Sequence, residues 1–327
     1  MIVRLGYVAM SVLVKNASPS QTMTAANFVK IADREAAVRK LERIAADNIR
    51  NTLRLLKHNR AYDIKIYRCS SRLIPLLGHE LLKEWDPLPA LAADFAELGR
   101  YAKQHGMRLS FHPEHYTVLS TPRHNVLESS LADLERHVAM LEAMGLKLSA
   151  NCNIHIGGTY GNKPAARARF IERFAALPER IARSITLEND DKTFNALETL
   201  EVCETVGAPM VLDLHHHEVN NAGEAAEALW PRIQATWENA FPFQMEGGRL
   251  PPKIHASSPK SDAEPRSHAD YVDAAKLLRF LRAIAPMTPC LDVMLEAKQK
   301  DAALLRLMED VQREPGVSLL TQASFEI

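Results

Sequence analysis

The chain alternates about eight times between short apolar runs rich in β-branched residues and longer stretches whose apolar residues follow helical spacing. Parallel strands need crossover connections, usually helices, so this order predicts a parallel sheet covered by helices. About eight repeats are typical of a closed (β/α)₈ barrel rather than an open doubly wound sheet. Neither a G-x-G-x-x-G motif nor a P-loop follows any of these runs. We therefore predict an α/β fold made of a single TIM barrel.

The expected strands and helices succeed one another along most of the chain. The strands are expected at 3–10, 64–69, 108–112, 147–155, 185–188, 209–213, 252–255 and 290–296. The helices are expected at about 24–58, 89–105, 130–144, 165–183, 195–206, 274–284 and 298–313, with a further helical region between the sixth and seventh strands. A chain of 327 residues fits one barrel. We predict a TIM-barrel domain at 1–313 and leave the tail at 314–327 unassigned.

Charge and cysteine usage limit the partners of the chain. Its 40 basic and 40 acidic residues cancel, so any contact with nucleic acid must come from a local patch. The apolar first residues contain Arg4 and are too short to span a bilayer, which favours a buried strand over a signal peptide. The cysteines show no paired spacing: they are Cys69, Cys152, Cys203 and Cys290. We expect free thiols in a cytoplasmic protein that does not contact membranes.

Residues 211–217 read V-L-D-L-H-H-H, an apolar run that ends in a carboxylate and three histidines. Asp and neutral His are ligands of divalent ions, although a solvated surface turn would also accommodate such a run. Six of the expected strands end in side chains of this kind. These residues are His112, His155, Glu188, Asp213, His216, His255 and Glu296.

In a barrel the C-terminal ends of the strands form one ring around one mouth. Each of these residues alone has an ordinary alternative, such as a polar strand terminus or a helix cap. Together they predict a metal cluster at the C-terminal mouth. Imidazole and carboxylate ligands without thiolates suit Mn²⁺, Zn²⁺ or Fe²⁺, and their number implies about two or three ions. Such clusters hydrolyse phosphodiesters by activating water and neutralising phosphate oxygens.

Lys253 lies two residues before His255, so strand alternation directs both side chains to the same face. Burial and nearby cations push a lysine toward its neutral amine, which can take up CO₂ as a carbamate. The alternative is that Lys253 contacts a substrate phosphate. The residues themselves leave both possibilities open.

Nine motifs, spread from the first expected strand to the last expected helix, resemble those of the UV DNA damage endonucleases. They are L-G-Y-V-A-M-S, I-Y-R-C-S-S-R-L-I-P, H-P-E-H-Y, N-I-H-I-G-G-T-Y-G-N-K, L-E-N-D-D-K, L-D-L-H-H-H, K-I-H-A-S-S-P-K, H-A-D-Y and D-V-M-L-E-A-K-Q-K-D. The resemblance implies an α/β barrel with up to three divalent ions, usually Mn²⁺. It further implies nicking of duplex DNA immediately 5′ of cyclobutane pyrimidine dimers, 6-4 photoproducts and other distorting lesions, leaving a 3′-hydroxyl and a 5′-phosphate.

The resemblance also assigns roles to individual residues. It adds His268, which lies in an expected loop, to the ligands named above. It implies that Glu188 bridges two ions, that Lys253 carries the carbamate, and that Tyr7 lies near the scissile phosphate.

His115 and Tyr116 occupy the positions of a pair that wedges into the damaged duplex, where Gln followed by an aromatic residue is the expected pattern. Tyr116 keeps the aromatic plane for stacking, and His115 keeps a hydrogen-bond donor. Ordinary packing at the rim is the alternative for Tyr116. Glu114 departs from the small residue expected there and places a negative charge beside the DNA, which affects the expected affinity and lesion range.

Basic residues in the loops and helix starts at the metal-bearing end predict a rim that binds DNA phosphates. They are Arg68, Arg72, Lys163, Lys260, Arg266, Lys298 and Lys300. The expected partner is damaged double-stranded DNA, bound by a monomer. The nearest alternative function is an abasic-site endonuclease on a similar trinuclear barrel, and a metal-dependent sugar isomerase or epimerase is more distant. A non-enzymatic metal-storage barrel is the weakest alternative.

Overall fold

A closed barrel of parallel strands forms the centre of the computed structural model, which describes residues 1–146, 151–240, 244–245 and 248–327. In their order around the barrel, these strands are β1 (Ile2–Val8), β2 (Ile66–Arg68), β3 (Arg108–Phe111), β4 (Asn151–His155), β5 (Ile185–Glu188), β6 (Met210–Asp213), β9 (Lys253–Ala256) and β12 (Cys290–Leu295). The pairing of β12 with β1 closes the barrel. The predicted (β/α)₈ fold is therefore confirmed, although residues 147–150 of the expected fourth strand lie outside the described residues.

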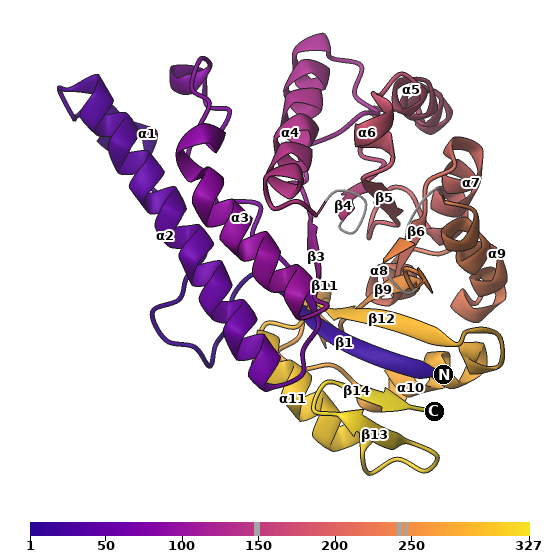
Figure 1. The fold of residues 1–327 in the computed structure, drawn as a ribbon. Helices are drawn as coiled ribbons and strands as arrows, with labels where there is room; N and C mark the ends of the chain where they lie inside the picture. Colours follow the sequence, from indigo (N-terminus) through magenta and orange to yellow (C-terminus); the bar gives the residue numbers. More distant parts are fainter. Residues whose placement is uncertain (147–150, 241–243, 246–247) are drawn as a thin grey trace.

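Helices surround the barrel and cover the apolar outer faces of its strands (Figure 1). They are α1 (Ala25–Val29), α2 (Arg34–Ala61), α3 (Leu88–Gln104), α4 (His124–Ala143), α5 (Lys163–Ala175), α6 (Glu179–Ala182), α7 (Ala196–Val206), α8 (Leu214–Val219), α9 (Ala226–Asn239), α10 (Ala274–Ile284) and α11 (Lys300–Val311), with short 3₁₀ turns η1 (Glu80–Leu82) and η2 (Ala285–Met287). Among the helices of the described ranges, none is both long and apolar enough to cross a bilayer.

Two of the expected helices are each divided into two. The side chain of Asp33 accepts a hydrogen bond from the Ala36 backbone N–H, so α2 starts anew after α1. Pro178 has extended backbone angles and separates α5 from α6, because proline disrupts a helix interior. Both breaks lie on the outside of the barrel and leave the strand order unchanged.

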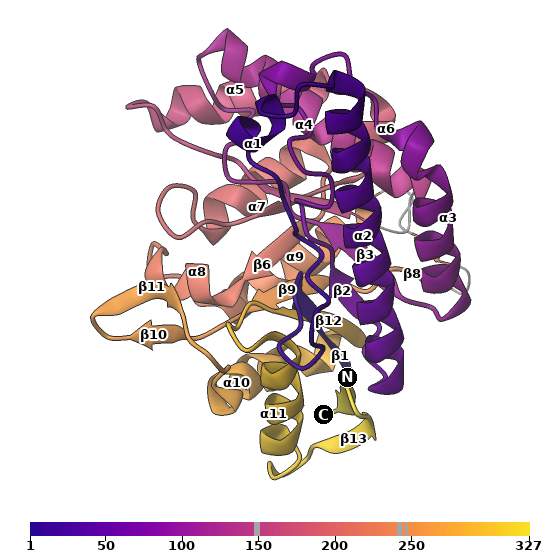
Figure 2. The same cartoon turned by 90° about the vertical axis from the view of Figure 1, so that its left-hand side faces the viewer.

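Shorter strands are added to the barrel outside its eight units. After β9, β10 (Pro259–Ser261) and β11 (Glu264–His268) form an antiparallel hairpin that projects beside α8 (Figure 2). The pair β7 (Gln244–Met245) and β8 (Gly248–Arg249) precedes β9. In the tail, β13 (Ser318–Thr321) pairs with β14 (Ser324–Glu326), and β14 pairs antiparallel with β1. The tail therefore packs on the barrel and buries Phe325, while its role in function remains unassigned.

An ionic layer crosses the barrel interior, set back from the C-terminal strand ends. Asp292 of β12 is 0% exposed and accepts from Arg4 Nε at 2.7 Å and from Arg108 Nη1 at 2.6 Å. Strand register places Asp292 beside both Arg4 and Lys253. The residues that follow along β9 and β12, His255 and Glu296, then reach the mouth. Asp292 and Lys253 of the ionic layer therefore lie on the same two strands that lead to Glu296 and His255, further inside the barrel.

Candidate metal centre

Glu188 lies at the centre of the mouth, at the end of β5, and is 1% exposed. Its Oε2 lies 3.2 Å from His112 Nε2, and its Oε1 lies 3.1 Å from His255 Nδ1. The buried amide of Asn153 donates to Oε2. The β4–β5 register places His155 directly beside Glu188. One carboxylate is thus held between imidazoles from three different strands.

The described residues contain two groups whose ligand atoms lie within 4.8 Å of one another. One group is His112, His155 and Glu188; the other is Glu188, Asp213, His255 and Glu296. Since Glu188 belongs to both, it has the position that a bridging ligand requires.

The two remaining predicted ligands lie at the edge of these groups. His216 Nδ1 is 3.5 Å from Glu188 Oε1 and 3.8 Å from Asp213 Oδ2. His268 Nε2 is 3.9 Å from Glu296 Oε2. The structure therefore brings all eight predicted ligands together at one mouth.

The electrostatics of the cluster favour positive charge. Burial raises the pKa of Asp213 to about 6; His216 opposes this rise and Glu188 adds to it. Burial would lower the pKa of His216 and of His255, but the surrounding carboxylates raise both to about 9. Two buried carboxylates, Glu188 and Asp213, and the partly buried Glu296 lie close enough together to need cations that compensate them.

Two buried polar atoms in the cluster lack hydrogen-bond partners within the described ranges: Asp213 Oδ2 and His255 Nδ1. His255 Nδ1 lies 3.1 Å from both Glu188 Oε1 and Glu296 Oε1, but the geometry is not that of a hydrogen bond. Burying such atoms without a partner is costly unless a ligand satisfies them. This observation, together with the sulfur-free set of nitrogen and oxygen donors, fits divalent metal ions.

Backbone carbonyls orient three of the histidines. His112 Nδ1 lies 3.0 Å from Pro113 O, His155 Nδ1 lies 3.2 Å from Glu188 O, and His216 Nδ1 lies 2.9 Å from Asn189 O. A carbonyl only accepts hydrogen bonds, so each Nδ1 carries a proton, and Nε2 is the nitrogen of each ring that could give a lone pair to a metal ion. These bonds assign Nε2 as the ligand atom of all three rings.

The three consecutive histidines form part of a helix, not a solvated turn. Asp213 ends β6, and its Oδ1 accepts from the backbone N–H of His216, which caps the start of α8. The helical turn then separates the rings: His216 faces the cluster, His215 faces β11, and His217 bonds to Glu224 O. Both His215 and His217 are buried. The sequence did not reveal that Asp213 is also a helix cap.

Lys253 is 1% exposed and has no hydrogen bond or ion pair with any described residue. Burial, followed by the charge of Arg108, holds the pKa of Lys253 well below its ordinary value. This environment favours the neutral amine over the ammonium, and the role of Lys253 remains a prediction.

Tyr7 is fully buried, and its hydroxyl donates to Asn59 Oδ1 of α2 at 2.7 Å. The structure thus places Tyr7 in the layer between the barrel and α2 and does not bring it to the mouth. Its catalytic role remains a prediction.

A cavity of about 420 Å³ opens over the cluster. Its walls include Glu188 and Glu296 together with loop residues that follow β1, β2 and β3. Arg68 pairs with Glu296 at the cavity floor, and its predicted phosphate contact remains a prediction. It therefore acts on the cluster itself.

Most of the predicted basic rim is engaged in ion pairs. Lys163 lies 2.6 Å from Glu198, Lys260 lies 2.5 Å from Glu264, and Arg266 approaches Asp191. Lys298 is exposed and, within the described ranges, forms no ion pair. The sequence predicted the positions of these charges but not their acidic partners.

His115 and Tyr116 project from the loop after β3, and Tyr116 is 60% exposed. Glu114 accepts from Arg72 Nε at 2.8 Å and from Ser71 Oγ at 3.0 Å. Burial opposes the ionisation of Glu114, but these bonds hold its pKa below the ordinary value. The expected negative charge is therefore compensated by Arg72, and the pair fastens the loop that carries Tyr116 to the loop after β2.

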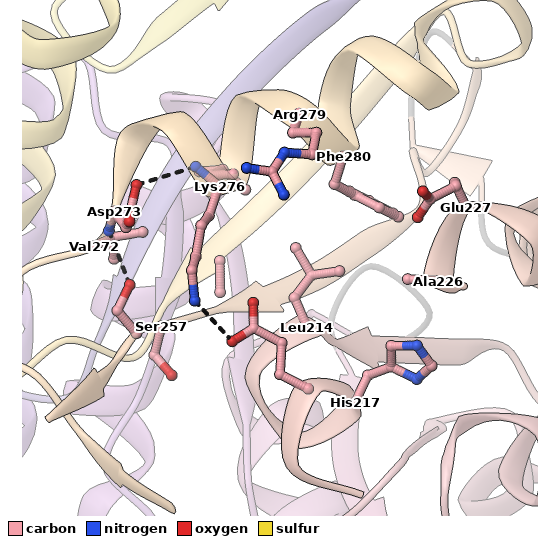
Figure 3. Close-up of a pocket in the computed structure, with 14 residues that line it drawn as sticks. Leu214, His217, Ala226, Glu227, Ser257, Val272, Asp273, Lys276, Arg279 and Phe280 are labelled. Carbon is pink, nitrogen blue, oxygen red and sulfur yellow. Dashed lines mark hydrogen bonds and ion pairs between the residues drawn. The ribbon is translucent and has the colours of Figure 1, made fainter. Parts of the chain in front are cut away.

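A second cavity of about 350 Å³ lies between α8 and α10 (Figure 3). Leu214, His217 and Phe280 line it, and Lys276 Nζ is 3.3 Å from Glu218 there. None of the predicted ligands lines this cavity. We therefore assign the chemistry to the mouth.

Comparison with known proteins agrees with this geometry. The family model described as UV-endonuclease UvdE matches residues 3–326. A UV DNA damage endonuclease from Halalkalibacterium halodurans is 41% identical over 327 residues, which cover 100% of this chain and 99% of the relative. The chain belongs to the UV DNA damage endonuclease family.

Solved structures separate the family from proteins that share only its fold. The crystal structure of SacUVDE matches this UV endonuclease with a TM-score of 0.81 and 26% identity, covering 95% of this chain and 100% of that one. A xylose isomerase domain protein from Planctomyces limnophilus matches with a TM-score of 0.52 and 13% identity, over 79% of this chain and 91% of that one. The second match shows a common barrel and does not support the sugar isomerase alternative. Family membership makes the chain a DNA-cleaving enzyme.

Proposed function

We propose that this endonuclease nicks duplex DNA immediately 5′ of UV photoproducts, both cyclobutane dimers and 6-4 photoproducts, leaving a 3′-hydroxyl and a 5′-phosphate. The observation that supports this most is the cluster around Glu188 on the floor of an open cavity. Action in the cytoplasm as a monomer is part of the proposal. Abasic duplexes are the alternative substrate.

The cluster residues would hold two or three divalent ions, with Mn²⁺ the first candidate and Zn²⁺ or Fe²⁺ the others. When bound, such ions supply a nucleophilic water near neutral pH and neutralise the charge of the phosphate and the leaving oxygen. Glu188 connects the two ligand groups, and Asn153 fixes its orientation. The histidines that bond carbonyls through Nδ1 would bind the ions through Nε2.

Lesion recognition would rest on the loop after β3. A damaged dinucleotide is already poorly stacked, so displacing it costs less than displacing an intact pair. Tyr116 offers an exposed ring for stacking, and His115 can donate a hydrogen bond to a base edge. The pair Arg72 and Glu114 would hold this loop in place as the duplex opens.

Replacing Tyr116 by Ala is expected to weaken binding of a dimer-containing duplex by about 1 to 3 kcal/mol, because one base loses its stacking platform. Fluorescence anisotropy with damaged and undamaged duplexes measures the change. Tyr116→Phe retains the ring and should bind like the wild type. Equal losses for the damaged and undamaged duplexes would argue against a role in lesion recognition.

We further propose that Lys253 carries a carbamate. Its neutral amine nitrogen attacks the carbon of CO₂ and releases a proton, which leaves an anionic ligand beneath the cluster. The cations that lower the pKa of Lys253, Arg108 and Arg68, would also stabilise this anion.

Substituting Ala for Lys253 is expected to lower metal affinity or cleavage by about 10- to 100-fold, the usual effect of losing an outer support of a metal site. Native mass spectrometry should show one added CO₂ on the wild type in bicarbonate and none on the variant. Lys253→Arg, which cannot be carboxylated, should be as defective. A Lys253→Ala enzyme that cleaves as fast as the wild type would exclude the carbamate role.

The function itself is tested with labelled duplexes carrying one cyclobutane dimer, one abasic site or no lesion, each with and without Mn²⁺. Metal-dependent nicking 5′ of the dimer is the expected result. Cleavage of the abasic duplex alone would favour the abasic-site alternative. No cleavage by a protein shown to bind metal would refute both.

A further inference from the structure

Ser257 lies between two histidines of the mouth, directly after β9. Its Oγ is 2.8 Å from His268 Nδ1 and 2.9 Å from His215 Nδ1. The other ring nitrogen of His215, Nε2, is 2.6 Å from the carbonyl oxygen of Pro265. These contacts form a continuous chain from Pro265 O through His215 and Ser257 to His268.

The donors and acceptors in these contacts indicate in which direction the hydrogen bonds run. Pro265 O can only accept, so His215 Nε2 carries a hydrogen. His215 is 1% exposed, so its ring nitrogens find their partners within the protein. In the tautomer that carries its single proton on Nε2, Nδ1 is an acceptor and the Ser257 hydroxyl donates to it. The Ser257 oxygen is left to accept from His268 Nδ1–H.

We propose that Ser257 and His215 are positioning residues that set the tautomer of His268, so that its Nε2 presents a lone pair to the metal cluster. Nε2 is the nitrogen of His268 that faces Glu296 Oε2, at 3.9 Å. The inference rests on the proposed metal-dependent function, and it adds two residues that contact a predicted ligand without being ligands themselves.

His268 needs this device because its partner differs from those of the other ligands. His112, His155 and His216 each bond a carbonyl, which accepts only, so the partner alone determines the tautomer. A serine hydroxyl both donates and accepts, so it stabilises either tautomer of His268 equally well. The direction of the hydrogen bond between Ser257 and His268 is therefore set by His215, the next residue in the chain of contacts.

The same chain also fixes the hairpin that carries His268. Pro265 and His268 both lie on β11, whereas His215 belongs to α8. His215 thus holds one point of β11 directly and a second point through Ser257. This explains how a ligand on a projecting hairpin is kept in register with ligands on barrel strands.

Three variants distinguish this role from simple packing. Ser257→Ala removes the acceptor of His268 and should weaken binding of one Mn²⁺ ion by about 10- to 100-fold. Ser257→Thr keeps the hydroxyl and should restore binding. His215→Phe should be at least as defective as Ser257→Ala, because the released hydroxyl can donate to His268 Nδ1 and place the ring proton on Nε2.

Ser258→Ala is the matched control. Its hydroxyl accepts from the Asp273 backbone N–H at 2.9 Å and contacts neither histidine, so Mn²⁺ binding should remain as in the wild type. Calorimetric titration with Mn²⁺ gives the number and affinity of the ions for each protein. The double variant of Ser257 and His215 should bind as the Ser257→Ala protein does, since both belong to one chain.

Long-range ¹H–¹⁵N spectra of the metal-free protein read the tautomer directly, with His268→Gln identifying the signal. We expect His268 to carry its proton on Nδ1 in the wild type and on Nε2 in His215→Phe. A wild-type proton on Nε2, or normal Mn²⁺ binding by Ser257→Ala, would overturn the proposal. Because the spectra need no metal, they judge the tautomer even where the proposed metal-dependent function fails.

Discussion

Replacing Glu188 by Gln is expected to slow nicking of a dimer-containing duplex by about 10³-fold or more, since metal-based charge stabilisation is worth several kcal/mol. Glu188 is shared by both ligand groups, so the change removes one carboxylate from each. The new amide would also place an N–H or a weaker acceptor against the Asn153 amide, which now donates to Oε2. Both effects disturb the centre of the cluster, although Gln has nearly the same volume as Glu.

Single-turnover cleavage at saturating Mn²⁺ and calorimetric Mn²⁺ titration measure this effect. Glu204→Gln on α7 is a suitable control, because its exposed ion pair with Arg232 lies outside the mouth. If Glu188→Gln retained Mn²⁺ binding and cleaved within about tenfold of the wild-type rate, Glu188 would not be a shared ligand.

The Asp292→Asn protein should lose about 3 to 5 kcal/mol in its free energy of unfolding, the usual effect of removing one partner from a buried ion pair. Asp292 is the carboxylate that Arg4 and Arg108 share inside the barrel, and Arg108 is itself buried. Removing its charge leaves a buried guanidinium without this compensation. Urea denaturation in the presence of a chelator measures the change without a contribution from bound metal.

Asp310→Asn provides the comparison at the surface. Asp310 pairs with Arg306 at 3.2 Å on the exposed side of α11, and such pairs contribute about 0 to 1 kcal/mol. Equal losses for Asp292→Asn and Asp310→Asn would show that the interior layer contributes no more than a surface pair.

The barrel could be predicted because its signals are local. Most strands are short apolar runs, the crossovers have helical spacing, and the order of the elements favours the closed fold. The ligands at strand ends followed from the same order, since parallel strands bring their C-terminal ends together. His268 followed only from the family motif, because the polar residues that form β10 and β11 carry no alternation typical of strands.

What the sequence did not reveal depends on contacts between distant residues. Glu114 looked unfavourable for DNA binding until its pairing with Arg72 across two loops was seen. Arg68, predicted as a phosphate contact, also bonds Glu296, 228 residues away. The sequence motifs likewise contain Ser257 and His215 without showing that they touch. Side-chain partners of this kind are set by the closed barrel, not by spacing along the chain.

The pairing of the first strand with the last ones also affects the order in which the barrel can form. Ile2 pairs with Cys290 and Val3 with Phe325, so β1 finds these neighbours only after residues 290–326 have been made. Contacts so distant in sequence slow folding and leave strand edges open in the nascent chain. Glu296 follows β12 and arrives equally late. A nascent chain that has not yet reached β12 therefore lacks Glu296 and cannot assemble the complete set of candidate ligands.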